Sequence, residues 1–115
     1  PDPKDTRVPN SSFPSRLATM IRLALLPDGA SPEDVLRSER LAQAAGLTGA
    51  EIDAARHGRS FDVGANAAIN LAQSIALQDP GMIAHQRVQA SASGLSPADI
   101  LAVERETLRL LPPPN

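Results

Sequence analysis

The amino-acid sequence predicts an all-α fold, a small bundle of about six helices. Two patterns favour this prediction: apolar residues recur with the spacing of a helix face, and no segment alternates apolar and polar residues as a strand does. Composition agrees, because aromatic residues make up only 2% of the chain although 42% of it is hydrophobic. The core is therefore aliphatic, which suits packed helices better than a sheet.

A chain of 115 residues has room for one domain. Residues 1–12 contain three prolines and no hydrophobic period, so we expect a flexible N-terminal arm, or a strap against a partner. Residues 13–115 form the predicted helical domain.

The first predicted helix follows Pro14 and is stopped by the Pro-Asp-Gly turn at residues 27–29. Its apolar stripe consists of Leu17, Met20, Ile21, Ala24 and Leu25. A second helix begins after Ser31, whose hydroxyl is suited to accept from first-turn amides, and it runs to about Ala45. Gly46 is then expected as a left-handed cap.

Sharper start signals precede the remaining helices. Thr48 and Glu51 have the spacing of a capping box and begin a third, short helix that ends near Gly58. The fourth helix is capped by Asp62 and ends before the Asp-Pro pair at residues 79–80. That pair opens the fifth helix, which ends at Gly94. A sixth starts at the Ser-Pro-Ala-Asp segment 96–99 and is terminated by the prolines at 112–114.

One sequence block recurs after 48 residues, because AGLTGAEI at 45–52 is echoed by SGLSPADI at 93–100. Each copy lies where one predicted helix ends and the next begins. We interpret the echo as the same helix-to-helix turn used twice, and not as a repeated binding element.

Composition excludes several classes of function. The chain has no cysteine, which rules out disulfides, thiolate metal sites and thiol mechanisms on this chain. Eleven basic and thirteen acidic residues give a net charge of −2 without a basic cluster, so we expect no nucleic-acid partner. Apolar stretches are far shorter than the roughly 20 residues that span a bilayer, so we expect no membrane partner and a cytoplasmic location.

Three blocks resemble a known family in their order and spacing: MIRLA at 20–24, LAQAAGLTGAEI at 41–52 and SGLSPADI at 93–100. Together they resemble the carboxymuconolactone decarboxylase superfamily, which includes the AhpD-like alkylhydroperoxidases. The resemblance covers residues 19 to about 103 and implies an all-α, AhpD-like fold.

In the peroxidase branch, the resemblance implies a Cys-x-x-Cys pair followed four residues later by a His. The matching positions here are Ser31, Asp34 and Ser38, none of which supports that chemistry, because serine and aspartate cannot form the sulfur intermediates. No histidine lies near Ser38 for a decarboxylase either. We therefore favour a capping role for this segment over a rebuilt active site.

Two histidines are the candidates for acid–base chemistry at neutral pH. His57 lies between Arg56 and Arg59 at a predicted helix end, where a solvated terminus is the favoured interpretation and a small-anion site is the alternative. His85 follows Met82 by about one turn and has the position to reach a cleft between helices or subunits. No metal-ligand spacing or phosphate-binding loop occurs, so we expect no metal or cofactor.

Our leading functional hypothesis is an AhpD-like protein without the peroxidatic cysteines, acting as a small-molecule binder or a structural subunit. One alternative is a decarboxylase- or isomerase-type enzyme that uses His57 or His85 as acid or base. Another is a partner subunit of a cysteine-bearing antioxidant homologue. The leucines at 108, 110 and 111 pack either within the domain or against another subunit. Since the resembled family commonly forms dimers, trimers or hexamers, we expect a homo-oligomer.

Overall fold

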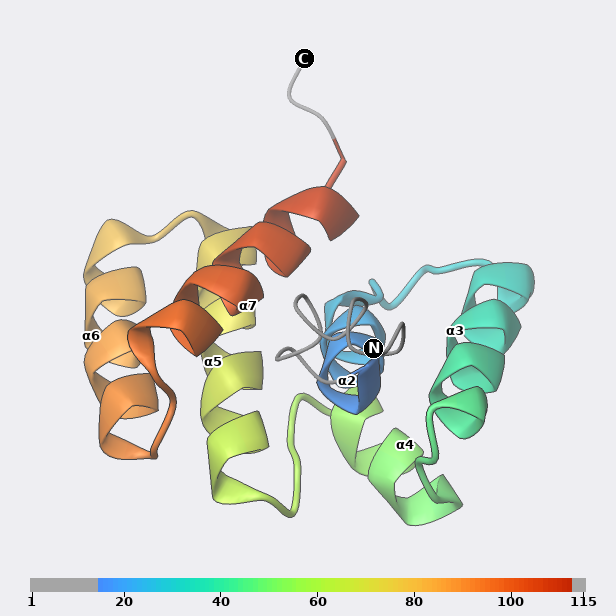
Figure 1. Cartoon of the computed structure of the whole chain (residues 1–115). Helices are drawn as coiled ribbons and strands as arrows, with labels where there is room; N and C mark the ends of the chain where they lie inside the picture. The colour runs from blue at the N-terminus through green and yellow to red at the C-terminus, as the bar shows by residue number, and fades with distance from the viewer. Residues whose placement is uncertain (1–14, 113–115) are drawn as a thin grey trace, which may run out of the picture.

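A computed structural model describes residues 15–112, and these form six α-helices without a strand (Figure 1). The helices are α2 (Ser15–Leu25), α3 (Pro32–Ala44), α4 (Gly49–Arg56), α5 (Val63–Leu77), α6 (Pro80–Ala92) and α7 (Pro97–Leu110). The all-α prediction with about six helices is confirmed for this part of the chain, and the predicted starts and stops lie within about two residues of the observed helix ends. The predicted arm at residues 1–12 lies outside the described residues.

Side-chain caps explain why the helix starts were readable from the sequence. Each helix after α2 is preceded by a residue whose side-chain oxygen accepts a hydrogen bond from a first-turn backbone N–H. These N-cap residues are Ser31, Thr48, Asp62, Asp79 and Ser96. Reciprocal capping boxes form at both copies of the echoed block.

The echoed block produces the same turn twice. Gly46 and Gly94 adopt φ values of 98° and 105°, which favour glycine. In each turn the leucine after the glycine donates its backbone N–H to a carbonyl five residues earlier, at 3.0 Å in both copies. This is the bonding pattern of a Schellman motif followed directly by a new helix start.

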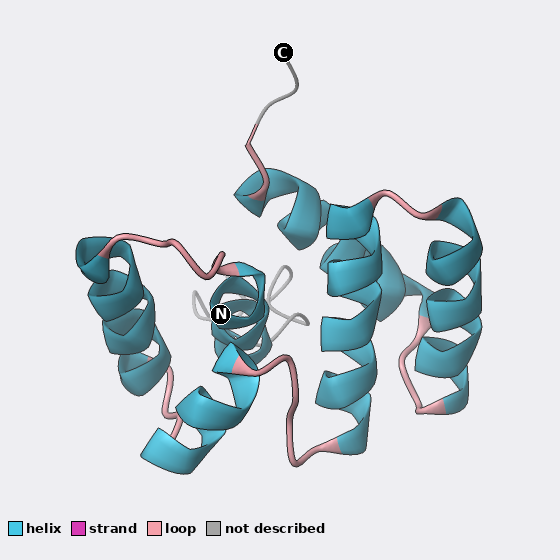
Figure 2. Ribbon diagram, turned by 180° about the vertical axis from the view of Figure 1, so that it is seen from behind, coloured by secondary structure: helices cyan, strands magenta, loops and turns pink. Residues whose placement is uncertain are grey.

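Helix α2 lies between two groups of helices, as Figures 1 and 2 both show. On one side it contacts α3 and α4, and on the other it contacts α5 and α7. Helix α6 packs along α5, and α7 crosses α5 to complete this second group (Figure 1). The connection from α4 to α5 joins the two groups along the chain.

Two aliphatic clusters form the core, and α2 contributes to both. The first contains Met20, Leu23, Ala42, Leu47, Ile52, Ala55 and Ile69. The second contains Ile21, Ala68, Leu71, Ala72 and Val103. Leu17 packs against both clusters. In the apolar stripe predicted for the first helix, Met20 and Ile21 are buried and the other three residues are half-buried. Leu23, which that stripe did not include, is fully buried.

The end of α5 departs from the pattern of glycine caps. Its C-cap is Gln78, which adopts a left-handed conformation with φ 57° and ψ 39°. A side chain in this region costs roughly 1–2 kcal/mol relative to glycine. Because Asp79 must cap α6 at the very next position, the chain has to reverse within two residues. The Asp-Pro pair predicted the end of this helix, but no residue in the sequence predicted the left-handed conformation of Gln78.

The C-terminal leucines differ in burial. Leu110 packs against the second core cluster and Leu111 is half-buried, whereas Leu108 is 63% exposed. Packing within the domain thus accounts for Leu110, while Leu108 presents an apolar group to the surroundings.

Gly94 has a positive φ that alanine rarely adopts, so Gly94→Ala should destabilise the fold. A Cβ at Gly94 meets no atom within 4 Å, so the cost arises from backbone conformation alone. We expect the free energy of unfolding to fall by about 1–2 kcal/mol, measured by urea denaturation. Gly49→Ala is the matched control, because its Cβ also enters open space at an ordinary φ. Equal effects of the two substitutions would contradict this assignment.

Candidate functional site

The three family-site positions do not share a cavity. Ser31 is the exposed N-cap of α3, where its hydroxyl accepts from the backbone N–H of Asp34 at 3.1 Å. The Asp34 carboxylate is exposed and lies 3.6 Å from the guanidinium of Arg37. Both residues therefore serve the start of the helix, in agreement with the capping interpretation.

Ser38 lies instead in the interior, with no exposed surface. Its hydroxyl accepts a hydrogen bond from Nε of Arg22 at 3.0 Å, which links α3 to α2. None of these three positions lines any of the surface hollows described below. Sequence reasoning did not foresee the Arg22 contact, because it joins residues 16 apart through tertiary packing.

His57 lies at the C-terminal end of α4, as the sequence predicted, and its side chain is 61% exposed. Ring Nδ1 is 2.8 Å from the carbonyl oxygen of Asp53. A carbonyl oxygen only accepts, so this contact requires the proton on Nδ1. The ring is thereby tied to the end of its own helix.

The two arginines that flank His57 line different hollows. Arg56 lines a hollow of about 580 Å³ between α3 and α4, together with the carboxylates of Asp28, Glu39 and Asp53. Arg59 lines a smaller hollow of about 380 Å³ beside Phe61. His57 borders both, but no single hollow contains both guanidinium groups. An anion at Arg56 would also face three carboxylates.

A groove of about 430 Å³ between α5 and α6 contains the second histidine. Its walls are Ser60, Phe61, Val63, Asn66, Ala67, Asn70, His85, Gln86, Gln89 and Ser93, which we call the α5–α6 groove. His85 thus reaches a cleft between helices, which is one of the positions expected for it.

The α5–α6 groove is polar, and its walls carry no fixed charge. His85 is the one titratable residue among them. None of the lining residues is Asp, Glu, Lys or Arg, whereas four are asparagine or glutamine. Asn66 is oriented by its side-chain oxygen, which accepts from the backbone N–H of Ser60 at 2.9 Å. Its amide NH₂ remains available to donate elsewhere.

These amides are the site residues that the sequence interpretation missed. Asn66 and Asn70 are four residues apart on α5, and His85 and Gln89 are four apart on α6, so each pair shares a helix face. That spacing was visible in the sequence. The sequence alone did not predict that these faces of α5 and α6 line the same groove.

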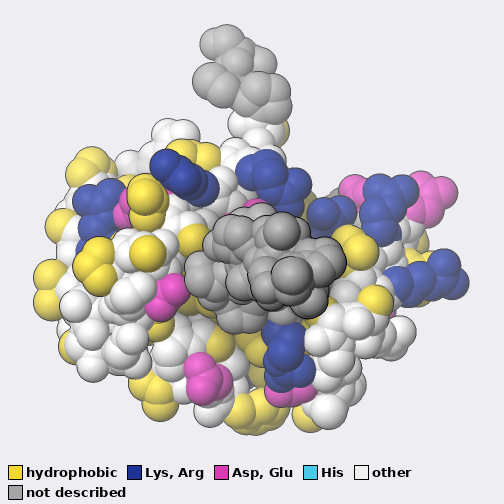
Figure 3. Space-filling model, viewed as in Figure 1, with side chains coloured by type: hydrophobic (Ala, Val, Ile, Leu, Met, Phe, Trp, Pro, Cys, Tyr) yellow, Lys and Arg dark blue, Asp and Glu magenta, His cyan; other side chains and the backbone are white. Residues whose placement is uncertain are grey.

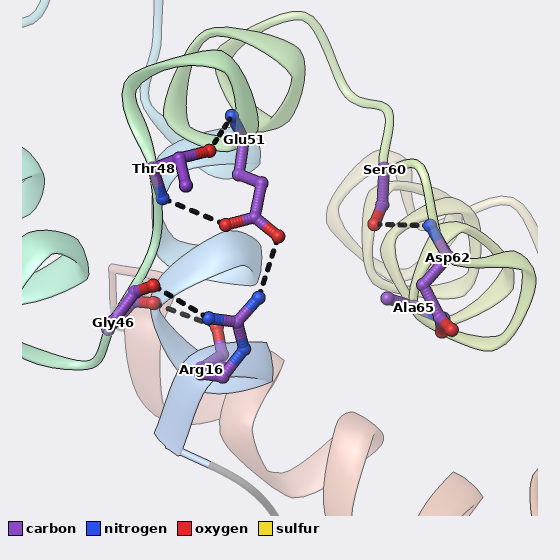
Figure 4. A network of polar contacts seen from close by, with 8 residues as sticks. Arg16, Gly46, Thr48, Glu51, Ser60, Asp62 and Ala65 are labelled. Carbon is purple, nitrogen blue, oxygen red and sulfur yellow. Dashed lines mark hydrogen bonds and ion pairs between the residues drawn. The ribbon is translucent and has the colours of Figure 1, made fainter.

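A larger hollow, of about 640 Å³, lies beside α2 and contains the polar network of Figure 4. Arg16 donates to the carbonyl of Gly46 at 2.8 Å and to the carboxylate of Glu51 at 2.7 Å. Glu51 also accepts from the backbone N–H of Thr48 at 2.8 Å. Asp62, on the opposite side, accepts from the amide of Ala65. Arg16, Glu51 and Asp62 are thus already engaged in hydrogen bonds at the starts of α4 and α5.

The network lowers the pKa of Glu51 below its usual value. The main cause is the hydrogen bond from the Thr48 backbone, and the Arg16 guanidinium acts in the same direction. Since both donors stabilise the carboxylate form, the capping box is strongest when Glu51 is ionised.

Acidic and basic side chains are interspersed on the face drawn in Figure 3, and neither kind gathers into one patch there. Within residues 15–112, no three His, Asp or Glu side chains approach closely enough to hold a metal ion. None of the six described helices has the length and apolarity needed to cross a bilayer.

Comparisons with family models, curated proteins and solved structures find no match for this chain. The likeness to the carboxymuconolactone decarboxylase superfamily therefore rests on the three sequence blocks.

Protonation of Glu51 should weaken the fold. Its folded pKa lies below the ordinary value of 4.5, so its stabilising effect is present above that pH and is lost as the pH falls through the folded pKa. We expect the stability difference between wild type and Glu51→Gln to shrink as the pH is lowered from 6 to 3, measured by urea denaturation. Arg16→Gln retains the Thr48 contact and should remove less of this pH dependence. A difference independent of pH would contradict the assignment.

Proposed function

We propose that this chain is an AhpD-like member of the carboxymuconolactone decarboxylase superfamily that lacks the peroxidatic cysteines and binds a small molecule without thiol chemistry. The order of the three sequence blocks supports the family.

The roles of the family-site positions support the loss of thiol chemistry. Peroxide reduction by a dithiol needs a thiolate nucleophile and a second sulfur to form the disulfide. Ser31 caps α3, Asp34 is exposed in its first turn, and Ser38 is buried against Arg22. All three are thus accounted for by the stability of the helix and its packing.

The α5–α6 groove is the single observation that carries the binding proposal. Ligand sites are concave and combine apolar surface with a few polar groups that fix orientation. This groove has a volume of about 430 Å³ and combines Phe61, Val63 and Ala67 with amide, hydroxyl and imidazole groups. The larger hollow beside α2 is a weaker candidate, because its Arg16–Glu51 pair already bridges structural elements.

One observation favours an enzyme as the second candidate. His85 is in the same groove as the amide side chains, so an acid–base group and groups able to orient a carbonyl lie together. A decarboxylase- or isomerase-type reaction needs both. His57 is less suited, because its ring Nδ1 is already engaged by the Asp53 carbonyl.

Assembly with other subunits belongs to the same proposal. Leu77, Val88 and Leu108 are each more than 60% exposed, and they lie on the group of helices formed by α5, α6 and α7. Covering such side chains would add apolar burial to a core with few aromatic residues. We therefore retain the homo-oligomer, or pairing with a cysteine-bearing homologue, as part of the proposal.

The binding proposal predicts a site-specific response of the two histidines. In ¹H–¹⁵N NMR spectra of the labelled chain, a mixture of small fragments should shift the imidazole signals of His85 and leave those of His57 unchanged. His85→Ala should weaken fragment binding, and His57→Ala should preserve it. Shifts confined to His57, or no shift of the groove residues by any fragment, would contradict the proposal. Catalytic consumption of organic hydroperoxides by the purified chain would contradict the proposal that the loss of the cysteines has removed the peroxidase activity.

A further inference from the structure

We infer that the α5–α6 groove selects an uncharged ring ligand edged by neighbouring hydrogen-bond donors and acceptors, such as a heteroaromatic base or a monosaccharide. This inference rests on the proposed function, because it concerns the same groove and specifies the chemistry of its ligand.

The absence of charge in the groove walls is the first argument. Each of the ten lining residues is uncharged apart from the titratable ring of His85, in a chain of which 21% is charged. An ionic ligand entering the groove would lose part of its hydration and meet no fixed opposite charge there. A neutral polar ligand loses less hydration free energy, and hydrogen bonds to the groove compensate for that loss.

The distribution of carboxamides is the second argument. Asn66 and Asn70 stand on the α5 wall, and Gln86 and Gln89 stand on the α6 wall. A carboxamide carries a donor and an acceptor on the same carbon, which matches a donor–acceptor pair on the edge of a ring. Asn70 on the α5 wall and the two glutamines on the α6 wall therefore offer such pairs from two sides.

One of these amides is held in a defined orientation. The oxygen of Asn66 accepts from the Ser60 backbone N–H, so its NH₂ is the group left to a ligand. This contact also connects the segment before α5 to the first turn of that helix. A preoriented donor reduces the entropy that binding would otherwise cost.

Phe61 provides the third argument. It is one of only two phenylalanines in the chain, and it is 73% exposed although it borders the groove. An exposed aromatic face beside hydrogen-bonding groups suits the flat face of a base or the C–H face of a sugar. The volume of about 430 Å³ is near the low end of ligand pockets and fits one ring with short substituents.

Matched pairs of probes test the charge selectivity. Nicotinamide and its anionic counterpart nicotinate represent the heteroaromatic class, and methyl glucoside and methyl glucuronide represent the sugar class. Each is titrated into the ¹⁵N-labelled chain while the side-chain amide signals of Asn66, Asn70, Gln86 and Gln89 are followed. We expect saturable shifts with at least one neutral probe and at least about fivefold weaker binding of its anionic counterpart. The neutral probe that responds identifies the ligand source.

Two glutamine-to-alanine substitutions test whether the neutral probe binds in the α5–α6 groove. Gln89→Ala should weaken binding of the responding neutral probe about tenfold, in line with the loss of a paired hydrogen bond. Gln43→Ala is the matched control, because Gln43 lines the separate hollow that contains Arg56. Circular dichroism of both variants verifies that they remain folded. Equal affinities of the two variants would overturn the inference.

The outcomes also separate this inference from the proposed function. If only anionic or purely apolar probes shift the groove signals, the groove binds small molecules but the inferred ligand chemistry is wrong. If no probe or fragment shifts the groove signals, both fail. Neutral probes that shift residues elsewhere, and not the four amides, likewise overturn the inference.

Discussion

The packing of α2 against α5 is the interaction on which the rest of this structure depends. Helix α2 contacts α3 and α4 on one side and α5 and α7 on the other, and α5 adds Ile69 to the cluster on the α3–α4 side. Helix α2 has Leu23 in one core cluster and Ile21 in the other, both fully buried. Small residues on α5, among them Ala67, Ala68 and Ala72, let neighbouring helices approach closely. With few aromatic residues available, stability rests on this close aliphatic packing.

This arrangement explains why a polar groove exists at the α5–α6 edge. Helix α5 is buried by α2, α6 and α7, so its position is determined by the core. Helix α6 is peripheral, and Ala90 is its one fully buried residue. Four of the ten residues that line the groove between the two helices are amides, whose side chains can hydrogen bond to a ligand. The candidate site thus has one wall in the core and one peripheral wall, and we expect the peripheral wall to open more readily.

Local chemistry was readable from the sequence, whereas tertiary proximity was not. Helix starts and stops were predicted because caps such as Thr48 and glycines such as Gly94 act within a few residues of themselves. The burial of Ser38 against Arg22 and the meeting of Asn70 with the α6 face depend on how helices pack, which a single sequence does not encode locally. The left-handed Gln78 escaped prediction because glutamine is not a residue that signals such a turn.

Native-state amide hydrogen exchange, followed by NMR, tests this account of a rigid and a labile wall most directly. The slowest amides should lie in the middle of α2 and in residues 67–74 of α5, exchanging only by global unfolding. The amides of α6 around His85 and Gln89 should exchange faster, through opening of that helix alone. Protection of α6 equal to that of α5, or exchange of α5 independently of α2, would contradict the account.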